Sequence, residues 1–169
     1  MNSLVNSASP LTSFTSEGLL AEELILTLPQ LTNYDAILIG QIATSLGLSQ
    51  SLPIAIELQI GDQIIYHASL PGTNKENDSW LMRKARVVKL KQHSTMYEQV
   101  LAAEMKLDWH KENNLTKDTH ALEGGGLALF TKQAGFVGIL LISGLPQIED
   151  HLFGVSVLTE FLARKGELL

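Results

Sequence analysis

The sequence predicts an α+β fold, in which a central antiparallel β-sheet of about five strands has helices packed against it. Two pairs of apolar segments, 53–60 with 63–68 and 127–131 with 136–142, flank short connections and so predict two β-hairpins. Segments with apolar residues at helical spacing lie between and after these hairpins. A chain of 169 residues is long enough for one domain with a substantial core.

The first part of the chain is expected to hold a tail, a short strand and a helix. Residues 1–16 are rich in Ser, Thr, Asn and Pro, which predicts a flexible N-terminal tail ahead of a single domain at residues 17–169. The apolar segment 22–28 (EELILTL) suits either a short strand or the end of a helix, and we favour the strand. Residues 34–47 then predict an amphipathic helix capped by Asn33.

The first hairpin has a two-residue connection, Gly61-Asp62, that suits a type II′ turn. Isoleucine and leucine occupy alternate positions along 53–60, so one face of this strand is expected to lie in the core. Glu57 and Gln59 fall on the opposite face, which we therefore expect to be half exposed to water.

Two helices and a loop are expected between the hairpins. The first helix runs over 79–92 after an N-cap at Asn77 or Asp78, and the second runs over 95–107. Residues 108–118 (DWHKENNLTKD) are polar and predict a surface loop.

The last strand and the closing helix form the junction at which we expect the functional residues. The apolar run 136–142 is followed by Ser143-Gly144-Leu145-Pro146 and then by a helix over 146–164. Helical spacing predicts the buried face of this helix, formed by Ile148, Leu152, Val155, Leu158 and Leu162. Strand ends beside helix N-termini often hold ligands, which makes this junction the best candidate for a site.

The composition narrows the classes of partner. A net charge of -6 and an isoelectric point of about 5.3 argue against nucleic acid as the main partner, because phosphate binding needs a basic surface. The absence of cysteine excludes disulfides, thiol catalysis and thiolate metal sites. No stretch has the pattern of a signal peptide or membrane span, so we expect a cytoplasmic protein without membrane contact. A hydrophobic content of 45% against 18% charged residues predicts apolar surface buried in a homo-oligomer.

His151 is the strongest candidate for a catalytic residue. It follows Glu149 and Asp150 at the start of the closing helix, where the helix dipole disfavours an imidazolium ion. A neutral imidazole here could act as a general base or a ligand. The alternative is a cluster that only caps and packs the helix, because structural networks also gather charges.

Basic residues concentrate on the helix after the first hairpin. Arg83, Lys84 and Arg86 could clamp a carboxylate or phosphate, and Trp80 could form one wall of a pocket. The alternatives are a solvated or intersubunit helix for the charges and a core position for the tryptophan.

Other local motifs do not assemble a site by themselves. His67, His93, His110 and His120 lack the spacing of a local metal site, so no metal site is predicted. The EGGG segment at 123–126 lacks the Gly-Lys-Ser/Thr of a P-loop, and a tight entry to the following strand is the simpler interpretation.

Three segments together resemble a known family: LPGTNKENDSWLMRK with the following HST, then EGGG, then GFVGILLISGLPQIEDH. Over residues 20–165 the chain is similar to the GlcG/PduO C-terminal-like, or haem-degrading-domain-like, group, in the branch known as uncharacterised protein family 0303. The resemblance implies a profilin-like, GlcG-like sandwich and a homo-oligomer built from dimers. It also implies haem or a related tetrapyrrole as a possible cofactor.

The family motifs can be carried over residue by residue. Glu76 stands where Asp is usual, and Glu123 stands where the family has the His of a His-Gly-Gly element. The resemblance implies ligand-binding roles for Asn77, Trp80, Arg83, Lys84, Ser94, Glu123, Gly124, Gly125, Ser143, Glu149, Asp150 and His151.

The leading hypothesis is a cytoplasmic, oligomeric protein that binds a small anionic ligand of the haem or tetrapyrrole class suggested by the resemblance. Arg83 and Lys84 would meet the anionic group and Trp80 would pack on the apolar part. Glu149, Asp150 and His151 would line or brace the cleft.

The alternative is a structural or interaction protein without catalysis. In that case Arg83 and Lys84 would pair with Glu149 or Asp150 across a subunit interface. A third hypothesis is an enzyme in which His151 is the general base.

Overall fold

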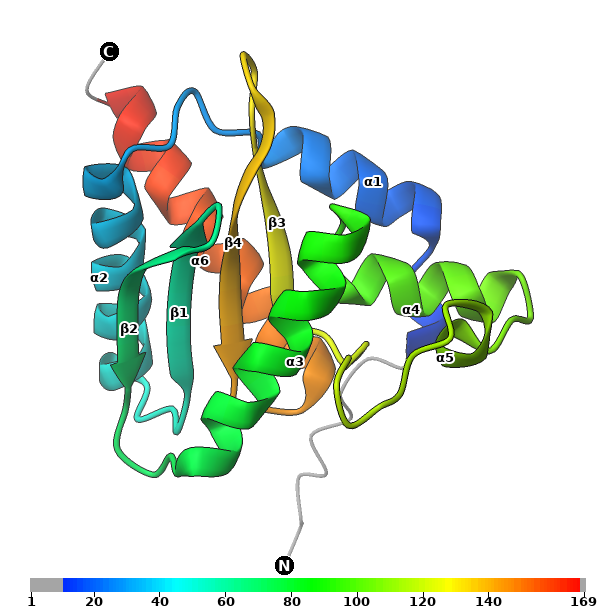
Figure 1. The fold of residues 1–169 in the computed structure, drawn as a ribbon. Helices are drawn as coiled ribbons and strands as arrows, with labels where there is room; N and C mark the ends of the chain where they lie inside the picture. Colours follow the sequence, from blue (N-terminus) through cyan, green and yellow to red (C-terminus); the bar gives the residue numbers. More distant parts are fainter. Residues whose placement is uncertain (1–10, 168–169) are drawn as a thin grey trace, which may run out of the picture.

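The structure is a computed structural model, and it describes residues 11–167 (Figure 1). Its centre is an antiparallel sheet with the strand order β2-β1-β4-β3. The strands are β1 (Ala55–Ile60), β2 (Gln63–Ser69), β3 (Gly126–Thr131) and β4 (Gly135–Ser143). Both predicted hairpins are present, and Gly61 has the positive φ, +56°, that a type II′ turn requires. The described sheet has four strands, one fewer than expected.

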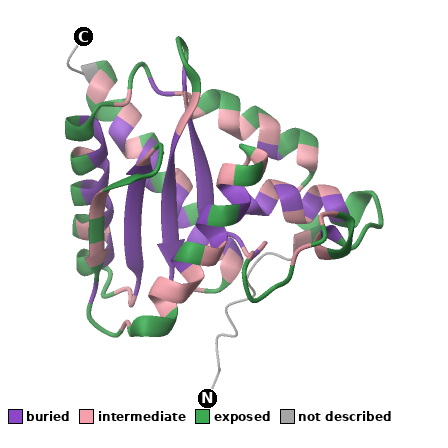
Figure 2. Ribbon diagram, in the orientation of Figure 1, coloured by how far each residue is buried: buried purple, intermediate pink, exposed green. Residues whose placement is uncertain are grey.

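Helices cover both faces of the sheet, so the fold is the predicted α+β sandwich, with three layers (Figures 1 and 2). Helices α2 (Asn33–Ser49) and α6 (Gln147–Glu167) pack on one face and enclose the larger core. Helix α3 (Lys75–Lys91) crosses the other face over a smaller core formed with Ala55, Ala128, Ile139 and Leu141. Each large apolar side chain buried in these layers contributes ~1.5–3 kcal/mol, which holds α3 and α6 against the end of β4.

The outer face of β1 is buried, contrary to the prediction of a half-exposed face. Only 8% of Glu57 and 7% of Gln59 are exposed, because α3 covers this side of the sheet. Gln59 Nε2 donates a hydrogen bond to Glu57 Oε1, and Glu57 also contacts His67, whereas Gln59 Oε1 has no partner within the described chain.

The predicted first strand is wrong, because its residues lie mostly in helix α1 (Ser16–Ile25). Thr15 caps this helix by accepting a hydrogen bond from the Gly18 N–H at 3.0 Å. Only Leu28 reaches the sheet, through an isolated bridge to Thr131. The second interpretation of this segment, the end of a helix, is therefore the correct one.

The expected N-terminal tail is only partly described. Residues 1–10 lie outside the described residues, whereas Leu11–Ser13 form a 3-10 helix directly before the cap of α1. The Phe14 ring meets the His151 ring edge-on at a centroid distance of 6.4 Å. The last residues of the expected tail thus pack against the closing helix.

Helix α3 begins one turn earlier than predicted. Asn74 is its N-cap, whereas Asn77 or Asp78 was expected. The Asn74 side chain accepts from the Glu76 N–H at 2.8 Å, and Asn77 Oδ1 accepts from the Asn74 N–H at 3.0 Å. Asn77 therefore completes a capping box instead of starting the helix.

The segment after α3 is more helical than predicted. Helix α4 (Thr95–Glu104) lies where expected and ends before Leu107. The expected loop at 108–118 contains a short helix, α5 (Trp109–Glu112). Trp109 explains the difference, because its ring is buried and its indole N–H donates to the buried Glu98 carboxylate at 2.7 Å.

The buried face of α6 differs from the predicted one. Ile148 and Leu158 are buried as expected, but Leu152 is 44% exposed. The inward positions of the described helix are instead completed by His151, Phe153, Val157 and Phe161.

Candidate functional site

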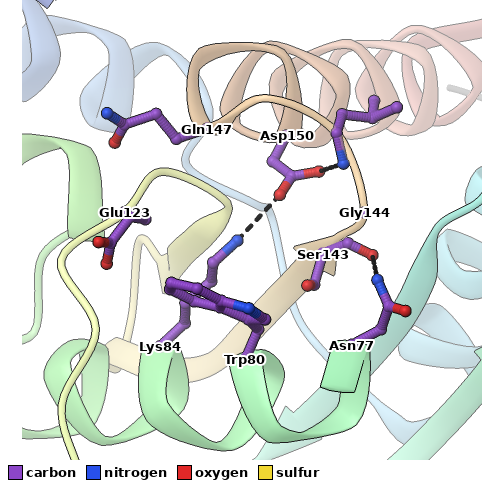
Figure 3. Close-up of a pocket in the computed structure, with 9 residues that line it drawn as sticks. Asn77, Trp80, Lys84, Glu123, Ser143, Gly144, Gln147 and Asp150 are labelled. Carbon is purple, nitrogen blue, oxygen red and sulfur yellow. Dashed lines mark hydrogen bonds and ion pairs between the residues drawn. The ribbon is translucent and has the colours of Figure 1, made fainter. Parts of the chain in front are cut away.

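A pocket of about 310 Å³ lies at the carboxyl end of β4, between α3 and the first turn of α6 (Figure 3). Three separate parts of the chain line it. Predicted site residues make up most of the lining: Asn77, Trp80 and Lys84 on α3, Glu123 before β3, and Ser143 and Asp150 at the junction of β4 and α6. Gly144, Leu145 and Gln147 complete it.

The three α3 residues face the pocket because their spacing places them on one side of the helix. Asn77, Trp80 and Lys84 are separated by three and four positions, which is the spacing of one helical face. Asn77 Nδ2 donates to the Ser143 carbonyl oxygen at 3.3 Å. The residue that closes the capping box therefore also joins α3 to the end of β4.

A buried ion pair lies at the base of the pocket. Figure 3 shows Lys84 reaching from α3 toward Asp150 on α6, with 2.9 Å between Nζ and Oδ2. Nζ also donates to the Ile142 carbonyl oxygen at 2.9 Å, and Asp150 Oδ1 accepts from the Leu145 N–H at 3.0 Å. Only 3% of each charged side chain is exposed, so these bonds, rather than water, hold both groups.

The low-dielectric surroundings shift both members of this pair toward their neutral forms. Burial lowers the pKa of the Lys84 ammonium, and the attraction of Asp150 offsets this only in part. Burial likewise raises the pKa of the Asp150 carboxyl, against the effect of the hydrogen bond from Lys84. The pKa values of the two groups consequently lie closer together than those of a free lysine and a free aspartate.

Two glycines allow the loop before β3 to cover this ion pair. Gly125 has a φ of +119°, and a Cβ there would lie 2.4 Å from the Ile142 carbonyl oxygen and 2.7 Å from Lys84 Nζ. A Cβ on Gly124 would lie 2.4 Å from the Gln147 carbonyl oxygen. Both predicted glycines are therefore close-packing positions behind the pocket, and a side chain at Gly125 would displace the ammonium.

Glu123 and Ser143 offer polar groups to the pocket. The half-buried Glu123 carboxylate forms no hydrogen bond or ion pair with another residue of the described chain, and neither does the Ser143 hydroxyl. Ser143 is 3% exposed. These two groups are accordingly available to a bound molecule.

The leading hypothesis required Arg83 and Lys84 to bind one anionic group together. Arg83, however, does not line the pocket. Its guanidinium carbon lies 3.9 Å from the centroid of the Trp80 ring. Its N–H groups donate to the carbonyl oxygens of Ser79 and Lys117 at 3.4 Å. Arg83 therefore braces one face of the tryptophan from outside the pocket.

Ser94 is likewise outside the pocket. It is the N-cap of α4, where its hydroxyl accepts from the Tyr97 N–H at 3.1 Å. Its own N–H donates to Glu23 on α1 at 2.8 Å. These contacts describe a structural residue that joins two helices.

His151 is also outside the pocket, although it is fully buried. Its Nε2 lies 2.7 Å from Glu22 Oε1, and its Nδ1 has no hydrogen-bond partner within the described chain. Glu149 does not line the pocket either. The predicted Glu149, Asp150 and His151 cluster is thus divided, and only Asp150 reaches the site.

The predicted site residues did not include three residues of the lining, Gly144, Leu145 and Gln147. Gln147 is the one of the three with a polar side chain. It occupies the first turn of α6, and its Oε1 accepts from the Gly124 N–H at 3.3 Å. Its position between Pro146 and the acidic pair of the motif was the available signal. Glu22, the partner of His151, gave no comparable signal because it lay in the predicted strand.

Within residues 11–167, no group of three or more His, Asp or Glu side chains is arranged to hold a metal ion. No described helix combines the length and the apolar character that crossing a membrane would need.

Comparisons with known proteins identify a matching family model and several relatives of this chain. The family model described as haem degrading protein HbpS-like matches residues 31–159. A UPF0303 protein of Streptomyces avermitilis is 35% identical over 144 residues, which cover 85% of this chain and 88% of that protein.

Solved structures show the same fold. The crystal structure of the Ybr137w protein superposes with a TM-score of 0.81 at 25% identity, over 89% of this chain and 91% of that one. A PduOC:Heme complex superposes with a TM-score of 0.65 at 15% identity, over 76% and 93% of the two chains. At that identity, the second similarity concerns the fold alone.

Proposed function

The chain belongs to the family of HbpS-like haem degrading proteins, and from this membership we propose that it binds a small organic ligand in the pocket around Trp80. One observation carries the proposal. Motif residues from α3, from the loop before β3 and from the junction of β4 and α6 converge on a single concave site. Its volume, about 310 Å³, lies at the small end of the range for ligand pockets.

The charges of the pocket favour a ligand with a cationic or hydrogen-bond-donating group. Asp150 already neutralises Lys84, and Arg83 is turned away. Glu123 adds a carboxylate that also attracts Lys84, so the ionised groups of the lining carry a net negative charge. A second carboxylate brought by a ligand would be repelled by Glu123 without a free cation to receive it, so the expected anionic ligand gives way to a neutral or cationic one.

Trp80 provides the apolar surface of the pocket. Arg83 stacks on its ring, so a planar ligand group would pack against the indole surface that faces the pocket. We propose that the ligand joins a flat apolar part, held by Trp80, to a polar edge held by Glu123 and Ser143.

Haem is the ligand class that the family and the PduOC:Heme neighbour suggest, but the residues of this pocket do not fit haem iron. None of its lining residues is a histidine, methionine, tyrosine or cysteine. Glu123 occupies the position of the family histidine, and Lys84 is engaged by Asp150 and Ile142. His151 is enclosed beside Glu22.

A haemin titration tests this part of the proposal. Haemin added to the purified protein should produce no saturable shift of the Soret band, because the pocket offers no imidazole. A shift that saturates at one haem per chain would contradict the proposal and would restore the tetrapyrrole ligand.

A pair of probes that differ in charge tests the ligand class. Benzylamine and benzoate share a flat ring, and calorimetric titration should show tighter binding of benzylamine because of Glu123. Trp80→Ala should weaken benzylamine binding by about tenfold, the effect of losing ~1.4 kcal/mol of ring packing. Met82→Ala is the matched control, because Met82 is exposed on the same helix. This pocket would be excluded as the binding site if benzylamine and benzoate bound with equal affinity and if Trp80→Ala bound both as tightly as the wild type does.

The alternative hypothesis, an interaction protein, placed an ion pair between Lys84 and Asp150 across a subunit interface. That ion pair does not support the alternative, because Lys84 and Asp150 pair within one chain. Self-association itself stays a prediction, and the exposed Leu24 and Ile25 on α1 are the surface that supports it. Sedimentation of the protein and of a Leu24→Ser, Ile25→Ser variant would test it.

The cytoplasmic location also stays a prediction, to be tested by cell fractionation.

A further inference from the structure

We propose that Lys84 captures small aldehydes or ketones covalently, through a Schiff base formed at Nζ in the pocket. The inference rests on the proposed function, because the carbonyl compound must enter the Trp80 pocket to reach this amine. It goes beyond non-covalent binding, because it assigns a chemical class to the ligand and a covalent bond to Nζ.

The amine of Lys84 is held in one position at the base of the pocket. Lys84 lines the pocket although only 3% of its side chain is exposed, so a ligand in the pocket lies beside an amine that is shielded from bulk water. The hydrogen bonds to Ile142 and Asp150, both 2.9 Å long, hold Nζ in place. A nucleophile held in a fixed position avoids the entropy cost that a mobile surface lysine pays when it attacks.

Asp150 is a partner that can accept a proton from this amine and return it. Asp150 Oδ2 is within hydrogen-bond distance of Nζ and can take the proton that must leave the ammonium before it attacks. The lowered pKa of Lys84 and the raised pKa of Asp150 reduce the cost of that transfer. The backbone N–H of Leu145 keeps the other carboxylate oxygen in position.

The step balances without any oxidant or reductant. Lys84 gives one proton to Asp150, and the free amine attacks the carbonyl carbon while the carbonyl π electrons move to oxygen. A proton moves from nitrogen to that oxygen, giving a carbinolamine. Asp150 then protonates the hydroxyl, the C–O bond breaks, and water leaves as the C=N bond forms. The product is a protonated imine beside the Asp150 carboxylate, with the same total charge as the original ion pair.

The pocket also selects the carbonyl compound. Trp80 favours a flat, conjugated group, and the small volume favours a single ring. Glu123 and Ser143 can receive hydroxyl or amino substituents on that ring. A small aromatic aldehyde meets these conditions, and benzaldehyde is the simplest probe.

The experiment traps the imine in the intact wild-type protein at neutral pH. Benzaldehyde is added with sodium cyanoborohydride, which reduces an imine to a stable benzylamine, and the modified lysines are identified by peptide mapping. Five exposed lysines act as internal references: Lys75, Lys106, Lys111, Lys117 and Lys132. Lys84 should be modified several-fold faster than these, because its amine is held in place beside Asp150 and a lowered pKa raises the fraction of free amine at neutral pH.

Two variants show where the selectivity comes from. Trp80→Ala should slow trapping at Lys84 and leave the exposed lysines unchanged, whereas Met82→Ala should change neither. Lys84 modified more slowly than the exposed lysines, or only after unfolding, would overturn the inference.

A separate measurement distinguishes this failure from failure of the proposed function. Without the reductant, benzaldehyde should shift the indole N–H resonance of Trp80, assigned with Trp80→Phe. A shift without trapping at Lys84 would overturn the covalent step alone. No shift and no trapping would overturn both proposals.

Discussion

At the scale of single residues, the site depends on Lys84 and Asp150, whose burial is costly. Removing two opposite charges from water costs several kcal/mol per ion, and their attraction repays this only when other hydrogen bonds are complete. Ile142 and Leu145 supply those bonds from the end of β4 and the turn that follows it. The pair therefore positions an amine and a carboxylate in the pocket more than it stabilises the fold.

This view predicts the stability of variants of the pair. Lys84→Met leaves a buried carboxylate and Asp150→Leu leaves a buried ammonium, so each should lower the free energy of unfolding by about 3–5 kcal/mol. The double variant removes both charges and should recover most of the loss. Urea unfolding of the four proteins gives the coupling energy directly. Additive losses in the double variant would show that the two charges do not depend on each other.

Sequence reasoning identified the pocket residues better than it identified their contacts. The motifs predicted Asn77, Trp80, Lys84, Ser143 and Asp150, all of which line the pocket. Residues that are adjacent in a motif lie on different sides of the structure, because a helix turns neighbouring side chains to different faces. Only the three-dimensional packing decides which face is inward.

Arg83 and His151 illustrate that limit. Arg83 directly precedes Lys84 and His151 directly follows Asp150 in the sequence, yet Arg83 stacks outside on Trp80 and His151 faces α1. Nothing in the sequence indicated that a carboxylate of α1 would meet His151, since α1 itself was predicted as a strand.

At the scale of elements, the hairpins and amphipathic helices were predictable and α1 was not. A hairpin is set by local turn chemistry at positions such as Gly61. An isolated apolar run such as 22–28 fits a strand or a helix, and long-range contacts decide. Here α1 is held by polar contacts with the segments around α4: the Ser16 N–H donates to Glu104 at the end of α4, and Glu23 contacts His93 in the turn between α3 and α4.

The contact between α1 and α6 makes a testable prediction. Glu22→Ala would leave the fully buried His151 without its single hydrogen-bond partner in the described chain, since Nδ1 already has none. Such a group costs about 1–3 kcal/mol, so chemical unfolding should show a loss of that size. Hydrogen exchange should also become faster in α1.

Glu17→Ala is the matched control, because Glu17 is an exposed acid on the same helix. It should change the free energy of unfolding by less than about 0.5 kcal/mol. Equal effects of the two substitutions would show that the His151 contact does not hold α1.

At the scale of the whole molecule, the larger core closes where α2 meets α6. Asp35, 1% exposed, accepts hydrogen bonds from the N–H and hydroxyl of Thr32, and its Oδ1 lies 2.7 Å from Lys165 Nζ near the end of α6. This carboxylate thus caps one helix and pairs with the other. Its ionised form therefore contributes to the contact between α2 and α6.

The stability of the protein should accordingly fall in acid as Asp35 takes up a proton. Burial alone would raise the pKa of Asp35, but the hydrogen bonds from Lys165 and Thr32 outweigh it and hold the pKa below the ordinary value of 3.8. A lowered folded-state pKa means that the unfolded chain binds the proton more tightly. The contribution is then complete above pH 3.8 and is lost as the pH falls through the folded-state value.

Unfolding of the wild type and of Asp35→Asn between pH 7 and pH 2.5 tests this sign, because the variant cannot titrate at that position. The wild type should be the more stable protein by a constant amount from pH 7 to about pH 4, and the difference should shrink below pH 3.8. Glu160→Gln, which alters an exposed pair on α6 with Arg164, should leave the pH profile unchanged. A difference that grows in acid would mean that burial, not Lys165, dominates the pKa of Asp35, and that the contact between α2 and α6 does not depend on this charge.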